Sequence, residues 1–231
     1  MTGAGNPRPI PLTITPGLRG RVRVVTLGAR PVAVGPTGDG LRREIDGLVA
    51  ELRARFSGRS PAEISEIAAA RELYRTFGID PTKTRPSSEK LLRRVLREQP
   101  LPRISNAVDL GNLFALRFLL PIGLFDAEKI DGPVELRPGL PGESYEGISS
   151  RPVHLEGRPA LADDRGAFGN PTADSRRTAV EAATRSLWMT VFAPASFPVV
   201  DLEAHVRRAA EDVGRHLSGA VPALTRITLV E

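Results

Sequence analysis

Three polar side chains, Asn106, Asp109 and Asn112, recur at intervals of three in the otherwise apolar stretch NAVDLGNLFALRFLLPIGLFD. Asn106 stands where a helix should begin, and Asp109 follows three residues later, which fits a capping box with Asp in place of Glu. Asn112 lies further inside, where an unpaired buried amide would cost about 1–3 kcal/mol. Its partner is therefore the backbone, Asp109 or a ligand, and Asn112 is the residue that most needs a pocket.

A second polar group lies in the loop DPTKTRPSSE, just ahead of a predicted helix. It contains two cations, Lys83 and Arg85, together with several hydroxyls. Hydroxyls, cations and free amides at the positive end of a helix are typical of an anion or phosphate site. A solvated loop fits the same residues, and the loop lacks the Walker spacing of nucleotide hydrolases.

The remaining carboxylates indicate no metal site. Asp163 and Asp164 could bind a divalent ion, but a turn built from DDRGAFGN explains the pair without one. The polar segment DSRRT, from Asp174 to Thr178, receives no role from its sequence. The histidines have no ligand spacing, and we predict neither a bound metal nor a cofactor.

Helical and strand patterns follow one another in blocks along the chain, which predicts an α+β fold with a central, mostly antiparallel sheet of short strands and packed helices. Residues 1–40 form a Pro/Gly-rich segment with two β-type runs, 21–29 and 31–35, that could pair as neighbours. Residues 41–231 form the α+β domain. Helices are expected at 41–56, 61–77, after Ser87, from Asn106 and at 202–219, and a last strand at 226–231.

Composition limits the chemistry, the compartment and the partners that we expect for the protein. The 231 residues are 41% hydrophobic and include no cysteine, so thiolate chemistry and disulfides are excluded. The longest nearly apolar run, 110–121, is too short to cross a bilayer, and no secretory signal precedes it, so we expect a cytoplasmic protein with no membrane contact. The net charge of +5, mostly from arginine, suits a phosphate-rich partner, although GC-rich coding would produce the same bias.

These motifs converge on one family. The stretch from Pro86 to Ile148 resembles the B3/B4 editing module of the phenylalanyl-tRNA synthetase beta chain. The shared pattern is an Asn, then Val-Asp-hydrophobic-x-Asn, a Pro-x-x-x-Phe-Asp turn, and a strand ending in Arg with Gly-Glu soon after. Here the pattern is carried by Asn106, Val108 to Asn112, Pro121 to Asp126, Arg137 and Gly142-Glu143. The flanks resemble freestanding relatives of the module.

The resemblance implies a B3/B4-like fold, tRNA or aminoacyl-tRNA as partner, and hydrolysis of the ester of mischarged tRNA without an obligatory metal. It does not imply aminoacylation by this chain alone. The expected catalytic residues are Asn112 and Asp109. The expected pocket residues are Asn106, Gly111, Gly123 and Glu143, and the expected nucleic-acid contacts are Lys83, Arg85 and Arg103.

Two positions depart from the family pattern. Gly111 replaces the usual Thr, and Gly123 stands where the synthetases place a pocket histidine. These departures leave two alternatives to an editing enzyme: a noncatalytic RNA-binding module, and a small-molecule protein that uses the pocket for an amino acid or related metabolite.

Overall fold

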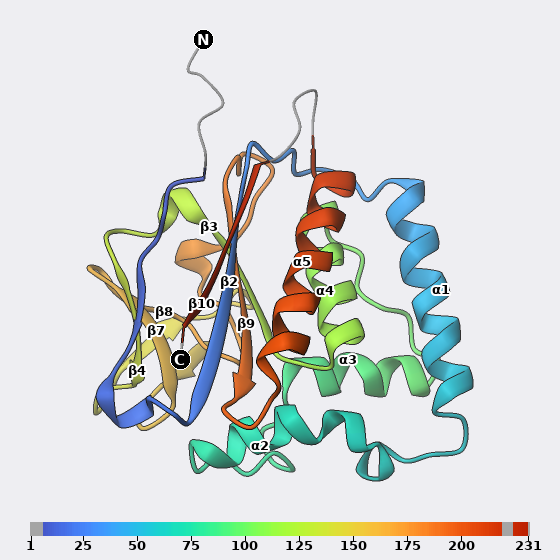
Figure 1. The fold of residues 1–231 in the computed structure, drawn as a ribbon, viewed down its shortest axis with the longest axis horizontal. Coiled ribbons are helices and arrows are strands. Elements are labelled where there is room, and N and C mark those ends of the chain that lie inside the picture. Colours follow the sequence, from blue (N-terminus) through green and yellow to red (C-terminus); the bar gives the residue numbers. More distant parts are fainter. Residues whose placement is uncertain (1–6, 219–223, 231) are drawn as a thin grey trace.

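The computed structural model describes residues 7–218 and 224–230, which form two four-stranded β-sheets, a two-stranded sheet and a layer of helices (Figure 1). The central sheet has the strand order β10-β2-β9-β3, the second sheet has the order β1-β4-β7-β8, and β5 pairs with β6. Within the described residues, only β1 and β4 pair in parallel among these strands. The predicted α+β class with short, mostly antiparallel strands is confirmed, with its strands divided between sheets.

The strands of the central sheet are β2 (Val22–Arg30), β3 (Ile122–Asp126), β9 (Leu187–Pro194) and β10 (Leu224–Val230). Those of the second sheet are β1 (Leu12–Ile14), β4 (Val134–Pro138), β7 (Pro159–Asp163) and β8 (Gly166–Gly169), and the separate pair is β5 (Ser144–Glu146) and β6 (Pro152–His154). The α-helices are α1 (Asp39–Arg55), α2 (Ala68–Thr76), α3 (Ser87–Leu96), α4 (Asn106–Phe118) and α5 (Val199–His216).

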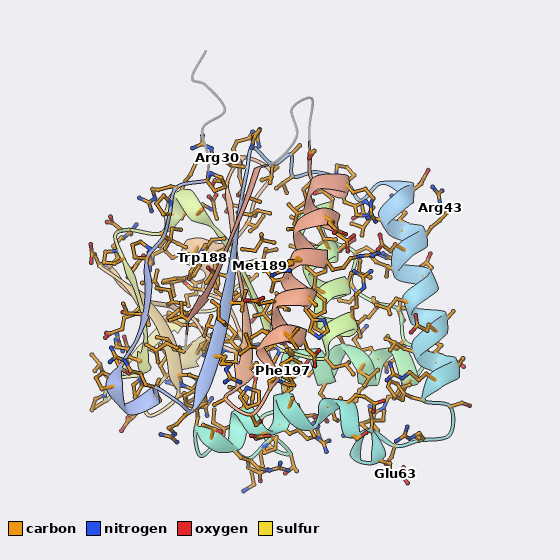
Figure 2. The ribbon with its side chains drawn as sticks, in the orientation of Figure 1. Arg30, Arg43, Glu63, Trp188, Met189 and Phe197 are labelled. Atoms are coloured by element: carbon orange, nitrogen blue, oxygen red, sulfur yellow. The ribbon has the colours of Figure 1, made fainter. Side chains whose placement is uncertain are left out.

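The central sheet is covered on both faces, by helices α4 and α5 on one side and by the second sheet on the other (Figure 1). Because side chains alternate along a strand, Trp188 on β9 packs toward the second sheet while its neighbour Met189 packs toward the helices (Figure 2). Every residue of β9 is buried, which explains its nearly continuous apolar sequence. No helix within the described residues is long and apolar enough to cross a membrane.

The first 40 residues supply strands to both sheets. β1 pairs with β4, and β2 lies between β9 and β10. The prediction that 21–29 and 31–35 pair with each other is wrong. Pro31 has no backbone N–H for a sheet, and β2 ends at Arg30.

The helix predicted at 61–77 is interrupted. Glu63 accepts a hydrogen bond from the Ser60 backbone at 2.7 Å, as a capping box requires. Two short 3₁₀ turns, Pro61–Glu63 and Ser65–Ile67, replace the first part of the helix, because Ile64 between them adopts an extended conformation and buries its side chain. Helix α2 begins at Ala68. The predicted helix at 202–219 appears as α5, while its expected end at Gly219 lies outside the described residues.

A buried carboxylate joins α2 to α3. Glu89 on α3 is 1% exposed and accepts two hydrogen bonds from Arg71 of α2, both at 2.9 Å, and one from Arg93 at 3.0 Å. Burial alone would raise the pKa of Glu89, but these hydrogen bonds outweigh it and hold the pKa below its usual value. The ionised form is therefore stabilised in the folded protein.

Replacing this carboxylate tests the bridge. We expect Glu89→Gln to lower the free energy of unfolding by about 2–3 kcal/mol, because charge-assisted hydrogen bonds are lost in a buried site. Since the folded pKa of Glu89 is depressed, its contribution is present above the unfolded value of about 4.3 and is lost as pH falls through the folded value. Urea unfolding at pH 7 and at pH 3 measures both effects.

The exposed ion pair between Arg55 and Glu66, 2.7 Å apart, provides the control. Glu66→Gln removes the same charge, but water screens this pair, so the loss should stay below about 1 kcal/mol. Equal losses in the two variants at pH 7 would contradict the account of Glu89.

Candidate functional site

One face of α4 forms the wall of a cavity of about 220 Å³. This face consists of Val108, Gly111, Asn112 and Ala115, whose spacing of three and four residues places them on one side of a helix. The other walls come from α3, β3 and three loops: Ser87, Leu91, Ile104, Ile122, Leu124, Ile148, Asp174, Ala179 and Val180. The lining is largely apolar, and Asn112, Asp174 and Ser87 supply its polar side chains.

The start of α4 differs from the sequence-based prediction. Ser105, not Asn106, is the N-cap, and its hydroxyl accepts a hydrogen bond from the Val108 backbone at 3.3 Å. The Asn106 side chain instead accepts from the Gly35 backbone at 2.9 Å and donates to the Ala33 carbonyl at 2.8 Å. Asn106 therefore anchors α4 to the segment after β2 and does not line the cavity.

Asp109 is also structural. It is 1% exposed, and its two oxygens accept from the Thr37 hydroxyl at 2.6 Å and from the Ile104 backbone at 3.0 Å. Both oxygens are engaged, and the side chain lies outside the cavity lining. The expectation that Asp109 takes part in catalysis is therefore not supported by its position.

Asn112 does reach the cavity. Six residues advance a helix by about 600°, so Asn112 points roughly 120° away from Asn106. Its side chain is half-buried and makes no hydrogen bond to any residue in the part of the chain that the structure describes. The amide is thus free to donate to, and accept from, a molecule in the cavity.

Asp174 is the carboxylate of the cavity, and it was not among the site residues expected from the sequence. Its Oδ2 accepts a hydrogen bond from the Leu124 backbone at 3.1 Å. β3 is an edge strand of its sheet, so this N–H points away from β9. Burial raises the pKa of Asp174 to about 7, even though the Leu124 hydrogen bond acts in the opposite direction.

Ser87 contributes a hydroxyl from the first turn of α3. Its Oγ is shielded from solvent and has no hydrogen-bond partner among residues 7–218 and 224–230. Three chemically different polar groups, an amide, a carboxyl and a hydroxyl, therefore line one small apolar cavity. Such a set can orient a small polar molecule with an apolar portion.

Of the two glycines expected in the pocket, only one lines the cavity. Gly111 lines the cavity, whereas Gly123 faces the other side of β3. A Cβ at Gly123 would lie 2.7 Å from the Phe125 ring and from the Thr190 hydroxyl. The ring also lies against Gly169, where an added Cβ would approach it to 2.6 Å. Gly123 therefore makes room for Phe125 and is not a pocket residue.

Glu143 likewise lies outside the cavity lining. It forms two hydrogen bonds with Arg137, both at 2.7 Å, and accepts a third from the Leu140 backbone at 2.8 Å. The Arg137 hydrogen bonds hold the pKa of Glu143 below its usual value despite partial burial. The motif of a strand-end Arg followed by Gly-Glu is thus a clamp across the turn between β4 and β5.

The three expected nucleic-acid contacts occupy two places. Lys83 and Arg85 are exposed in the loop ahead of α3, whose first residue lines the cavity. Arg103 lies in a separate surface groove and forms an ion pair with Asp46 at 2.8 Å. The loop is therefore the better candidate for contacting a phosphate close to the cavity.

In the turn that contains Asp163 and Asp164, an arginine binds the first carboxylate. Asp163 forms two hydrogen bonds with Arg177, at 2.8 and 3.0 Å, and Asp164 lies against Gly132. Within the described ranges, no group of three or more His, Cys, Asp or Glu residues is arranged to hold a metal ion. Arg177 belongs to the DSRRT segment, which thus braces β7 while presenting Asp174 to the cavity.

Comparison with known proteins places this cavity in a family. A family model described as the B3/4 domain matches residues 69–207, more than half of the chain and every residue that lines the cavity. The chain belongs to the B3/4 domain family. The resemblance to the B3/B4 module that was predicted from the sequence is confirmed.

Two curated relatives are longer than this chain and match part of it. The phenylalanine–tRNA ligase beta subunit of Neisseria meningitidis serogroup A is 26% identical over 138 residues, which cover 56% of this chain and 18% of that protein. The serogroup B protein is 29% identical over 89 residues, or 38% of this chain and 11% of that protein. The matches span less than a fifth of either relative.

A solved structure, an N-terminal fragment of the phenylalanyl-tRNA synthetase beta subunit from Pyrococcus horikoshii, aligns with 98% of this chain and 53% of its own. The two sequences are 14% identical and the TM-score is 0.47.

Asp174 is the functional candidate of this B3/4 domain that sequence reasoning missed. The sequence feature that could have indicated it is the polar DSRRT segment between apolar strands. A carboxylate close to two arginines, however, is typical of a surface ion pair. Only the fold shows that Arg177 turns to Asp163 while Asp174 turns to Leu124.

The two glycines give a matched test of the site geometry. Gly123→Ala should lower the free energy of unfolding by about 1–3 kcal/mol, because its Cβ would overlap Phe125 and Thr190. Gly111→Ala places its Cβ 3.6 Å from Leu124, an ordinary contact, and should raise stability by about 0.5–1 kcal/mol through helix propensity. Chemical denaturation measures both, and a stable Gly123→Ala would show that Phe125 does not fill this space.

Proposed function

We propose that this protein binds tRNA in the cytoplasm and hydrolyses the ester of mischarged aminoacyl-tRNA in trans, with the aminoacyl group in the α4 cavity. The observation that carries the proposal is the free amide of Asn112 in an apolar cavity within the B3/4 match. The relatives named as tRNA ligase beta subunits support tRNA as the partner.

The size and lining of the cavity favour a single aminoacyl group. A volume of about 220 Å³ lies below the roughly 300–1,000 Å³ of drug-sized pockets, so an amino-acid side chain suits it better than a nucleotide. The walls from Leu91, Val108 and Leu124 favour apolar portions of the substrate and disfavour unpaired charge.

Asn112 has the chemistry that ester hydrolysis needs. As water attacks the ester, negative charge develops on the carbonyl oxygen, and a positioned amide N–H stabilises it. The fixed backbone of α4 and the absence of a competing hydrogen bond within the described residues leave the Asn112 amide available for this contact.

Deacylation of a panel of mischarged tRNAs tests the reaction. We expect turnover above the buffer rate for at least one aminoacyl-tRNA, and a fall of about 100-fold in kcat for Asn112→Ala, the size of effect seen when one oxyanion donor is removed. Thermal unfolding of both proteins serves as the control, because an amide with no protein partner should be removable without a large change in stability.

Two results would count against the catalytic proposal. One is the absence of turnover for every aminoacyl-tRNA in the panel. The other is turnover that Asn112→Ala leaves unchanged.

Binding of the tRNA itself is a separate prediction. The double variant Lys83→Glu/Arg85→Glu should weaken tRNA binding and reduce the slope of log K against log salt by about one per lost phosphate contact. Arg43→Glu, on the solvent side of α1 (Figure 2), makes the same type of charge change and should retain most of the affinity. Fluorescence anisotropy across a salt series measures both, and equal losses would reject the loop as the contact.

The small, largely apolar cavity also favours a second candidate, a protein that binds a free amino acid or a related metabolite. Thermal stabilisation by free amino acids, together with salt-insensitive or absent tRNA binding, would favour it over editing. Salt-dependent tRNA binding without turnover would instead favour a noncatalytic RNA-binding module.

A further inference from the structure

Asp174 is held firmly where several elements meet. Its backbone carbonyl accepts a hydrogen bond from the Ile148 N–H at 3.2 Å, and its main chain bridges to Gly169 at the end of β8. The next residue, Ser175, bridges to Gly147 and donates its N–H to the Phe168 carbonyl at 2.9 Å. The backbone that carries the carboxyl is therefore fixed from both sides, as a reacting group requires.

The carboxyl itself is only half satisfied. Oδ2 accepts from the Leu124 N–H at 3.1 Å, and no described side chain donates to Oδ1. This differs from the two oxygens of Asp109, which both accept hydrogen bonds, and from Asp163, which is paired with Arg177. One oxygen of Asp174 is free for water or substrate in the cavity.

No described cation neutralises Asp174. Arg176, two residues along the chain, turns to Glu146 at 3.3 Å and to the Ser150 hydroxyl at 2.8 Å. The nearby Tyr145 donates its hydroxyl to the Ala173 carbonyl, and its pKa is raised by burial and then by the charge of Asp174. Asp174 is the titratable residue of the cavity lining in the described part of the chain.

We propose that Asp174 is the catalytic residue that accepts the proton of the attacking water and passes it to the departing ribose oxygen. This inference rests on the function proposed above and adds the group that moves the proton. The free Oδ1 in the cavity, the Leu124 hydrogen bond that orients the carboxyl, and the lack of a neutralising arginine carry it.

The step balances without another reactant. The Asp174 carboxylate takes one proton from water while the water oxygen bonds to the ester carbon, and the carbonyl electron pair moves to an oxygen that faces the Asn112 amide. The carbonyl then re-forms, the bond to the ribose oxygen breaks, and Asp174 returns the proton to that oxygen. The products are a free amino acid and a tRNA with a ribose hydroxyl, and the acid loses its own proton to solvent.

A general base is most effective when its pKa lies close to the working pH. Burial raises the pKa of Asp174 to about 7, so both the accepting and the donating forms are populated near neutrality. Because the carboxylate must be ionised to accept a proton, kcat/KM should rise as pH increases through about 7 and then level off.

The test compares the wild-type protein with Asp174→Asn over a range of pH, on a mischarged tRNA that the wild type hydrolyses. The substitution keeps an acceptor oxygen for the Leu124 N–H and removes only the titrating group. We expect kcat/KM to fall by about 100-fold or more and its rise near pH 7 to disappear, while tRNA affinity stays within about twofold. Asp131→Asn, at an exposed aspartate outside the cavity, should leave rate and profile unchanged.

Folding of the variant has its own readout. The folded pKa of Asp174 is raised, so ionisation destabilises the folded protein progressively as pH rises from about 4 through about 7. Asp174→Asn removes this effect and should unfold at the same or a higher temperature than the wild type at pH 8. A lost rate in a protein that still melts normally is therefore a chemical effect.

The outcomes separate the two proposals. A wild-type protein that deacylates no tRNA overturns the proposed function and this inference together. An active wild type whose Asp174→Asn variant keeps its rate, or keeps the rise near pH 7, overturns the inference and leaves the proposed function standing. An Asp131→Asn loss equal to that of Asp174→Asn would also overturn the specific role of Asp174.

Discussion

The cavity depends on how the first turn of α4 is anchored. Asn106 binds the segment after β2 through Gly35 and Ala33, and Asp109 binds Thr37 and Ile104. These buried hydrogen bonds fix the rotation of the helix, because leaving any of their groups unpaired would cost about 1–3 kcal/mol. With α4 fixed, helical geometry directs Asn112 into the cavity. Of the polar residues in this apolar stretch, Asn106 and Asp109 therefore anchor the helix, and Asn112 faces the cavity.

A second constraint acts on β3, the strand that faces α4 across the cavity. The Phe125 ring fits against Gly123 and Gly169, where side chains would collide with it, and this packing settles which side of the strand is turned inward. Ile122 and Leu124 then face the cavity, and the edge N–H of Leu124 holds Asp174. The same glycine that departs from the family pattern thus supports the wall against which the carboxyl is positioned.

Local patterns in the sequence predicted the α+β class, helices α1, α3, α4 and α5, and the family, because amphipathic spacing and motif order are readable without tertiary contacts. They could not show that β2 pairs with β9, because the two strands are far apart in the sequence. Nor could they show that Asp109 binds Thr37 and that Glu143 binds Arg137, since these contacts form only in the folded chain. Asn112 was found because an amide inside an apolar helix is conspicuous. Asp174 was missed because two arginines follow it closely in the sequence, and only the fold shows that Arg176 pairs with Glu146 and Arg177 with Asp163.

In the proposed function, an aminoacyl group attached to tRNA enters the cavity between Asn112 and Asp174. The most direct measurement is a crystal structure of the protein with a 3′-aminoacylamino-3′-deoxyadenosine, in which an amide replaces the labile ester of the tRNA end. We expect the aminoacyl group within the α4 cavity, its carbonyl oxygen hydrogen-bonded to Asn112 and the amide nitrogen on the side of Asp174. An analogue bound elsewhere on the protein, or seated with its carbonyl directed away from both residues, would contradict it.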